Sequence, residues 1–294
     1  MSNDKEKFTP EVFRLFDKYV HGQISRRDFI DRAGAIAVAG MSGAALLDAL
    51  SPKFAEAQQI APTDERIKAE YIEIRAPGYG KVRGYLVKPV KASGKLPAVL
   101  VVHENRGLNP HIEDIARRVA LENFIAFAPD ALHPLGGYPG NEDKARELFQ
   151  QLDQTKTRED FIATAKYLQS AAGTNGKVGV VGFCYGGAIA NFLATKLPTL
   201  NAAVPFYGSP PTPSDVAGIK APLLIQFAET DERISAAWPA SEAALKEAKV
   251  NYQAFIYPGT QHGFNNDTTP RYNKEAADLA WKRTIEFFNR ELRA

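Results

Sequence analysis

Apolar runs of strand length alternate with helix-type patterns along most of the chain, from about residue 62 to the end. Residues 71–76 and 81–87 alternate apolar and polar side chains on either side of a turn, which predicts an antiparallel hairpin at a sheet edge. Residues 97–102 are continuously apolar, as is typical of a parallel strand buried on both faces. Further strand-like runs lie at 124–128, 178–183, 202–207, 222–227 and 252–257. Helical spacing falls between them, at 112–120, 142–152, 158–171, 188–194, 237–248 and 274–292.

Strands that alternate with helices in this way predict fold class α/β, with a doubly wound and mostly parallel sheet. The chain has 294 residues, enough for one large α/β domain at residues 62–294 and an extension at residues 1–57. Hydrophobic residues make up 45% of the chain and charged residues 24%, which suits a globular protein with a sizeable core. No apolar run reaches the roughly 18 residues that a membrane span needs.

The extension carries a pattern typical of a twin-arginine export leader. Arg26 and Arg27 are followed two places on by Phe29, and then by a run rich in Ala and Gly at 33–47. Residues 55–57 form a small-x-small cleavage site. This pattern predicts an exported, periplasmic protein and a transient partner in the twin-arginine machinery.

Residues 9–21 of the extension leave a second interpretation open. They are spaced as a short amphipathic helix, with Thr9 as its cap and Pro10 in its first turn. A removable leader does not need such a helix, and Asp28 and Asp31 surround the arginines. The alternative is therefore a retained helical arm that docks on the main domain of a cytoplasmic protein.

Charge and residue counts exclude several classes of function. The formal net charge is +2 and no basic cluster interleaves with aromatic residues, so no nucleic-acid partner is expected. Cys184 is the only cysteine, which excludes an internal disulfide. His103, Glu104 and His111 are close in sequence but lack a recognised ligand spacing, so we expect no metal and no other cofactor.

Residues 177–187 combine a strand, a sharp turn and the start of a helix around that cysteine. Gly182 and Gly186 stand two places before and two places after Cys184, where side chains would keep the strand and the helix apart. The arrangement resembles the nucleophile elbow of α/β-hydrolases, with Cys in place of the usual Ser. The alternative is a buried core cysteine beside a glycine turn.

Two residues farther along the chain favour the catalytic interpretation. Asp231 and His262 each follow a predicted strand, and the order nucleophile, acid, histidine is that of the hydrolase fold. The pattern predicts that His262 takes the thiol proton and that Asp231 orients the imidazole. The backbone N–H groups of Tyr185 and Asn105 are the expected oxyanion donors. Such a site attacks an ester or lactone carbonyl, forms an acyl-thioester and hydrolyses it.

Residues 182–187, followed by Asp231 and His262 and preceded by Glu104 after a buried strand, resemble the dienelactone hydrolase family, the carboxymethylenebutenolidases. The resemblance covers roughly residues 65–293. It implies an α/β-hydrolase fold, a Cys-His-Asp triad and a small ester or lactone as substrate. It also implies that Glu104 contacts the thiol and modulates its conversion to thiolate.

The chain departs from the family pattern where the substrate carboxylate is held. The family has an arginine in the loop after the Ala-Pro-Asp segment and another just beyond the histidine, whereas neither 131–138 nor 263–267 contains one. The chemistry is therefore better supported than the substrate. Four residues are candidates for the substrate pocket, with ion pairing or ordinary packing as the alternative for each: Arg106, Tyr138, Trp238 and Arg271.

Two other functions stay open at this stage. A broader carboxylesterase or thioesterase uses the same triad, and fold analogy does not exclude it. A hydrolase-fold protein that binds a small ligand or a partner without catalysis is the second alternative, although a binding protein has no need of an intact triad.

Overall fold

The computed structural model describes residues 8–36 and 40–293. Its centre is an eight-stranded sheet with the order β1-β2-β4-β3-β5-β6-β7-β8. β2 pairs antiparallel with β1 and with β4, and all the other neighbours pair parallel. The strands are β1 (Ile67–Ala76), β2 (Gly80–Pro89), β3 (Leu96–Val102), β4 (Ile125–Pro129), β5 (Thr174–Phe183), β6 (Ala202–Phe206), β7 (Leu223–Thr230) and β8 (Tyr252–Gln261).

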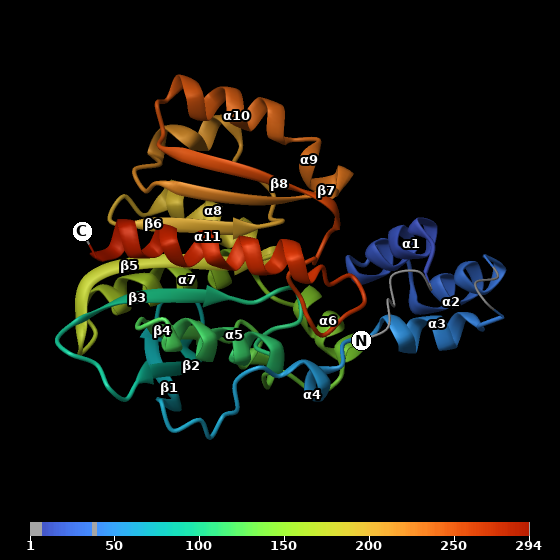
Figure 1. The fold of residues 1–294 in the computed structure, drawn as a ribbon, viewed down its shortest axis with the longest axis horizontal. Coiled ribbons are helices and arrows are strands. Elements are labelled where there is room, and N and C mark those ends of the chain that lie inside the picture. The colour runs from blue at the N-terminus through green and yellow to red at the C-terminus, as the bar shows by residue number, and fades with distance from the viewer. Residues whose placement is uncertain (1–7, 37–39, 294) are drawn as a thin grey trace.

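Helices cover both faces of this sheet, because its central strands are apolar on both sides. In β3, Val99 and Val101 face one core, whereas Leu100 and Val102 face the other. The first core packs against α5 (Pro110–Leu121) and α11 (Lys274–Arg293). The second packs against α7 (Gln154–Ser170), α8 (Tyr185–Lys196) and α10 (Trp238–Glu247). Figure 1 shows α5 and α11 in front of the sheet and α7 and α8 behind it. These layers confirm the predicted doubly wound α/β class.

Shorter elements complete the main domain between these helices and strands. They are η2 (His133–Leu135), α6 (Glu142–Gln150), η3 (Pro213–Gly218) and α9 (Glu232–Ser235).

The sequence predicted a hairpin at one sheet edge, and β1 and β2 form it with ten paired positions from Ile67↔Pro89 to Ala76↔Gly80.

The described residues between 8 and 57, which we call the N-terminal arm, form four helices. These are α1 (Pro10–Val20), α2 (Arg26–Ala35), α3 (Gly43–Leu50) and α4 (Phe54–Ala57). The first three share an apolar core of their own that includes Val12, Phe16, Phe29, Leu46 and Leu50. The arm lies at the edge of the sheet toward which the arrowheads of β3 and β6 point (Figure 1). No helix among the described residues is long and apolar enough to cross a membrane.

Local signals in the sequence account for the arm helices. The Thr9 side chain accepts a hydrogen bond from the Val12 amide at 3.4 Å, so α1 begins where the sequence predicted. Ser25 and Asp28 form a reciprocal capping box at the start of α2. The apolar run at 33–47 is divided between α2 and α3, and its residues 37–39 lie outside the described part of the chain.

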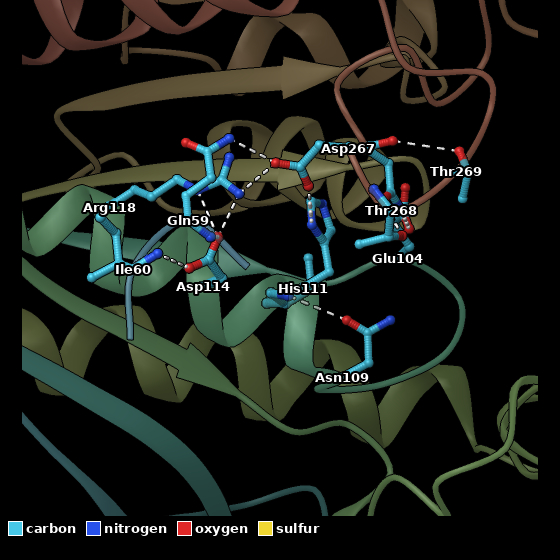
Figure 2. A network of polar contacts seen from close by, with 12 residues as sticks. Gln59, Ile60, Glu104, Asn109, His111, Asp114, Arg118, Asp267, Thr268 and Thr269 are labelled. Atoms are coloured by element: carbon cyan, nitrogen blue, oxygen red, sulfur yellow. Dashed lines mark hydrogen bonds and ion pairs between the residues drawn. The ribbon is translucent and has the colours of Figure 1, made fainter. Parts of the chain in front are cut away.

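A polar network ties the segment between the arm and the main domain to α5 and to the loop after β8 (Figure 2). The backbone amides of Gln59 and Ile60 donate to the Asp114 carboxylate, at 3.2 and 2.8 Å. Arg118 bridges Asp114 and Asp267, with Nη2 2.6 Å from Oδ2 of Asp267. Burial raises the pKa of Asp267, but its imidazole and guanidinium neighbours outweigh burial and lower that pKa to about 2. This network fixes the loop that begins at residue 262.

Candidate active site

Cys184 lies between β5 and α8 in a strained backbone conformation. Its φ is +56°, a region that non-glycine residues rarely adopt. A Cβ at Gly182 would lie 1.9 Å from the carbonyl oxygen of Gly186, and a Cβ at Gly186 would lie 2.2 Å from that of Val102. Gly182 is therefore required for β5 and α8 to cross this closely, as the sequence predicted for an elbow, and Gly186 allows α8 to lie against the end of β3. The turn leaves Cys184 half-buried at the carboxyl edge of the sheet.

Asp231 and His262 come together at the ends of β7 and β8. Oδ2 of Asp231 lies 2.6 Å from Nδ1 of His262, and both side chains are buried. A ring nitrogen of His262 and Sγ of Cys184 lie within 4.8 Å of each other. Nε2, the ring nitrogen of His262 that does not face Asp231, has no hydrogen-bond partner among the described residues. The carboxylate thus holds one side of the ring, and the other side is free to exchange a proton.

The charges in this group favour an ion pair over a neutral thiol and imidazole. Burial alone raises the pKa of the Cys184 thiol, but the imidazoles of His262 and His21 outweigh burial and lower that pKa. Burial lowers the pKa of His262, but the thiolate and Asp231 outweigh it and raise that pKa. Each shift has the direction that an activated thiol requires.

Tyr207 supports the histidine from a position that the sequence analysis missed. Its ring centroid lies 5.0 Å from that of His262 and 5.5 Å from that of Phe264. Its φ is +36°, and it follows β6, the strand next to the elbow strand. A residue just past a central parallel strand belongs to the same sheet edge as the elbow, which is the signal that would have pointed to it.

A cavity of about 400 Å³ opens onto Cys184 and His262. This volume lies within the range of small-ligand pockets, about 300–1,000 Å³. Five residues predicted for the site line it: Glu104, Asn105, Arg106, Tyr138 and Arg271. The structure therefore brings these predicted residues to one cavity with the candidate nucleophile.

Arg106 and Arg271, two of the three arginines that line that cavity, have largely buried side chains and are ion-paired. Nε of Arg106 lies 3.6 Å from Oε2 of Glu142. Nη1 of Arg271 lies 3.7 Å from Oδ1 of Asp17, in the N-terminal arm. Each guanidinium thus faces both a carboxylate of the protein and the cavity, so the sequence alternatives of clamp and ion pair coexist.

Three predicted residues of the site have the following contacts. Tyr185 is the first residue of α8, where a backbone N–H has no acceptor within the helix. Asn105 donates from its side chain to the carbonyl of Val20 at 3.0 Å. Oε2 of Glu104 accepts a hydrogen bond from Asn266 at 3.0 Å, and no bond between Glu104 and Cys184 occurs in the described part of the chain. The predicted contact between Glu104 and the thiol is thus not made in this structure.

Trp238 is absent from the residues that line the cavity, unlike the other three candidates for the substrate pocket. Trp238 is the first residue of α10, and its ring centroid lies 4.9 Å from that of Phe227 and 6.0 Å from that of Tyr252. It is partly buried and packs against the second core. Ordinary packing, the alternative interpretation, accounts for it.

His21 is a further residue at the thiol that the sequence analysis missed. Its Nε2 lies 3.5 Å from Sγ of Cys184, and its ring centroid lies 4.9 Å from that of His262. The spacing of residues 9–21 predicted the helix that carries it, but nothing in the pattern indicated where that helix docks. By contrast, His103 accepts a hydrogen bond from the Ala131 amide, and Nδ1 of His111 lies 3.2 Å from the Asp267 carboxylate, so the two histidines form no common site.

Known proteins resemble this chain along most of its length. A family model described as the dienelactone hydrolase family matches residues 82–292, and a model described as YqhI-like matches residues 1–38. A "Putative carboxymethylenebutenolidase" from Synechocystis sp. is 35% identical over 233 residues, covering 72% of this chain and 93% of that protein. The "Putative hydrolase fragment YghX" of Escherichia coli is 63% identical over 116 residues, covering 39% of this chain and 99% of that protein.

A solved structure shows which fold this chain shares with its relatives. The crystal structure of a "Putative Dienelactone Hydrolase" from Klebsiella pneumoniae superposes with a TM-score of 0.68 and 29% identity. It covers 76% of this chain and 98% of its own. The fold is therefore that of the α/β-hydrolases, as predicted.

Proposed function

The chain belongs to the dienelactone hydrolase family, and we propose that it hydrolyses a small lactone or carboxylic ester through a Cys184–His262–Asp231 triad. One observation carries this proposal. A buried carboxylate and imidazole, 2.6 Å apart, face a thiol on a strained turn at the wall of a 400 Å³ cavity. A protein that only binds a ligand has no use for that combination.

In the first half of the proposed reaction, the Cys184 thiolate attacks the substrate carbonyl carbon. A C–S bond forms, and the carbonyl oxygen becomes an oxyanion. The N–H groups of Tyr185, at the start of α8, and of Asn105 are the proposed donors to that oxyanion. When the oxyanion collapses, the bond to the alkoxy oxygen breaks, and that oxygen takes the proton from Nε2 of His262.

In the second half, water attacks the acyl-thioester and gives a proton to Nε2 of His262. The C–S bond then breaks, which releases the carboxylic acid and restores the Cys184 thiolate. Asp231 keeps the ring in one orientation through both halves and stabilises its charged form. Glu104 lines the same cavity, and we propose that it modulates the thiol once substrate displaces it from Asn266.

The cavity supports a small substrate without a strict need for a free carboxylate. Arg106 and Arg271 already face Glu142 and Asp17, so each has less positive charge to offer an anion. This pairing favours a broader carboxylesterase as the second candidate function.

A panel of lactones, dienelactones and aryl esters, assayed with wild type and Cys184→Ala, tests the proposal. We expect hydrolysis of at least one member of the panel and a loss of about 10³-fold or more in kcat for Cys184→Ala, as in other triads. Full activity of Cys184→Ala would overturn the assignment of the nucleophile. Failure of wild type on the whole panel would overturn the reaction class.

A further inference from the structure

The last turn of α1 ends directly above the candidate nucleophile. His21 caps this helix, and its Nε2 lies 3.5 Å from Sγ of Cys184, although the two residues are 163 positions apart. This contact joins the N-terminal arm to the atom that is proposed to react. None of the dienelactone hydrolase features described above includes a residue from this part of the chain, which precedes the matched residues 82–292.

The main domain holds the end of α1 through polar contacts. The last carbonyl groups of a helix lack partners within the helix and carry partial negative charge. Asn105 and Arg106 donate to the carbonyl of Val20, at 3.0 and 3.2 Å. Arg146 donates to the carbonyl of Tyr19 at 2.8 Å. Three side chains of the main domain thus hydrogen-bond to the terminal carbonyl groups of α1 where it meets the active site. These bonds fix the position of His21, the next residue.

Asp17 holds the His21 ring through its backbone carbonyl oxygen and an ion pair, whereas Asp231 holds the His262 ring through its carboxylate. Nδ1 of His21 lies 2.8 Å from the carbonyl oxygen of Asp17 and 3.2 Å from its carboxylate. A carbonyl oxygen only accepts, so the contact with it requires a proton on Nδ1, and Nε2 is then the ring nitrogen that lies near the sulfur. The thiol therefore lies between two Asp–His pairs, one from the main domain and one from the arm.

The arm does not fill the site. The 400 Å³ cavity remains beside Cys184, and arm residues form part of its wall, including Tyr19, Leu47 and Phe54. A second cavity of about 300 Å³, lined by His21, Cys184 and Tyr185, lies on another side. The position of His21 is thus compatible with a substrate bound at the thiol.

We propose that His21 is an active-site residue of the intact chain, which donates a hydrogen bond from Nε2 to the sulfur of Cys184 and is held there by Asp17. The proposal rests on the proposed function, since it takes Cys184 as the nucleophile. In each turnover the sulfur is an anion twice, before it attacks the carbonyl and after the C–S bond breaks. While His262 exchanges protons with the alkoxide and with water, His21 keeps its own proton and stabilises the thiolate.

The charged groups around His21 come from four elements. Asp17 faces it from α1, Cys184 from the start of α8, His262 from the loop after β8 and Arg233 from α9. Nη2 of Arg233 lies 3.0 Å from Nε2 of His21, and the guanidinium charge disfavours a positive charge on the His21 ring. The Arg233 side chain is exposed, however, and solvent screens its charge. Burial lowers the pKa of His21, and the Cys184 thiolate and Asp17 outweigh burial and raise that pKa.

The pH dependence of thiol alkylation tests the proposal without requiring turnover. A positive charge next to a thiol favours the thiolate, so its removal raises the thiol pKa. The rate of Cys184 alkylation by iodoacetamide is measured between pH 4.5 and 10 on the full chain with EDTA present. We expect the apparent thiol pKa to rise by about one unit or more in His21→Gln, which keeps a hydrogen-bond donor but no charge. At low pH the alkylation rate of His21→Gln should then be lower than that of wild type by about tenfold for each unit by which the thiol pKa rises, and at high pH the two rates should converge.

Gln23→Ala is the matched control, because it removes an exposed neutral side chain two positions away. It should leave the pH profile unchanged. Melting temperatures identify any variant in which the arm no longer docks on the main domain. In that case Asp17→Asn is the second variant, and we expect it to raise the apparent thiol pKa by a smaller amount. An unchanged profile in folded His21→Gln would overturn the proposal, since Arg233 would then be the donor to a neutral ring. Faster alkylation in His21→Gln would also overturn it, because the ring would be blocking the thiol.

This experiment separates the proposal from the function on which it rests. A shifted alkylation profile without any ester hydrolysis would support the role of His21 at the thiol and count against the proposed reaction. Hydrolysis that depends on Cys184 but is unaffected by His21→Gln across the pH range would do the reverse.

Discussion

The carboxylate of Asp17 in the N-terminal arm lies 3.7 Å from the guanidinium of Arg271 in the main domain. Arg271 lines the cavity and is one of the two arginines that the sequence offered as candidates for holding a substrate carboxylate. Because an internal carboxylate already faces it, a substrate carboxylate gains less from binding there than at an unpaired arginine. The same reasoning applies to Arg106 beside Glu142.

We therefore predict modest selectivity for carboxylate substrates. The kcat/KM for a dienelactone carboxylate should exceed that for its methyl ester by less than about 100-fold, or about 2.7 kcal/mol. Asp17→Asn should increase this ratio, because it releases the charge of Arg271. Steady-state kinetics on the pair of substrates checks both statements. A preference of many orders of magnitude in wild type would show that a cation is free to bind the carboxylate.

The two partners of the nucleophile should differ in their importance. His262→Ala removes the group that moves the proton, and we expect kcat to fall by about 10³-fold or more. Asp231→Asn leaves a side chain of the same shape, so its loss should be severe but smaller. Rates at saturating substrate measure both effects, with circular dichroism to confirm folding. A variant of His262 with near wild-type kcat would contradict the triad.

The elbow should tolerate no side chain at Gly182. Gly182→Ala would place a Cβ 1.9 Å from the Gly186 carbonyl oxygen, and we expect a loss of about 1–3 kcal/mol or more in the free energy of unfolding. Gly34→Ala in the arm is the control, since its nearest new neighbour would be 3.4 Å away. Urea denaturation compares the two. Equal stability of both variants would mean that the close crossing is not required.

The sequence was sufficient for the parts of the site that depend on local patterns. An apolar run followed by Gly-x-Cys-x-Gly specifies the elbow, and strand order places Asp231 and His262 at the same edge. The docking of α1 depends on contacts that connect distant residues, such as Arg146 with the carbonyl of Tyr19, and no periodicity encodes those. For that reason His21 was missed.

The same limit applies to aromatic residues. Tyr138 and Trp238 were equivalent as isolated aromatic residues in the sequence. The structure separates them, because Tyr138 lines the cavity and donates to Glu142, whereas Trp238 packs between β7 and β8. Their places depend on tertiary packing, which a single sequence does not reveal.

The export prediction remains to be tested, and it bears on the role of His21. Arg26 and Arg27 open α2, and the predicted cleavage site at 55–57 lies in α4, so cleavage after it would remove the whole arm. We propose export by the twin-arginine route, with Arg26→Lys and Arg27→Lys together retaining the protein in the cytoplasm. N-terminal sequencing of fractionated protein checks this. Intact chain found only in the cytoplasm contradicts export, whereas a start at Gln58 would show that the mature chain lacks His21.

The central claim is that Cys184 carries the acyl group during turnover. Rapid acid quench of wild type during hydrolysis of an aryl ester, followed by mass spectrometry of the peptide that contains Cys184, tests it most directly. We predict a mass increase equal to the acyl group on Cys184, absent from Cys184→Ala and enriched in His262→Ala if that variant acylates. Ester hydrolysis by wild type with no acyl group on Cys184, and with undiminished turnover by Cys184→Ala, would contradict the account.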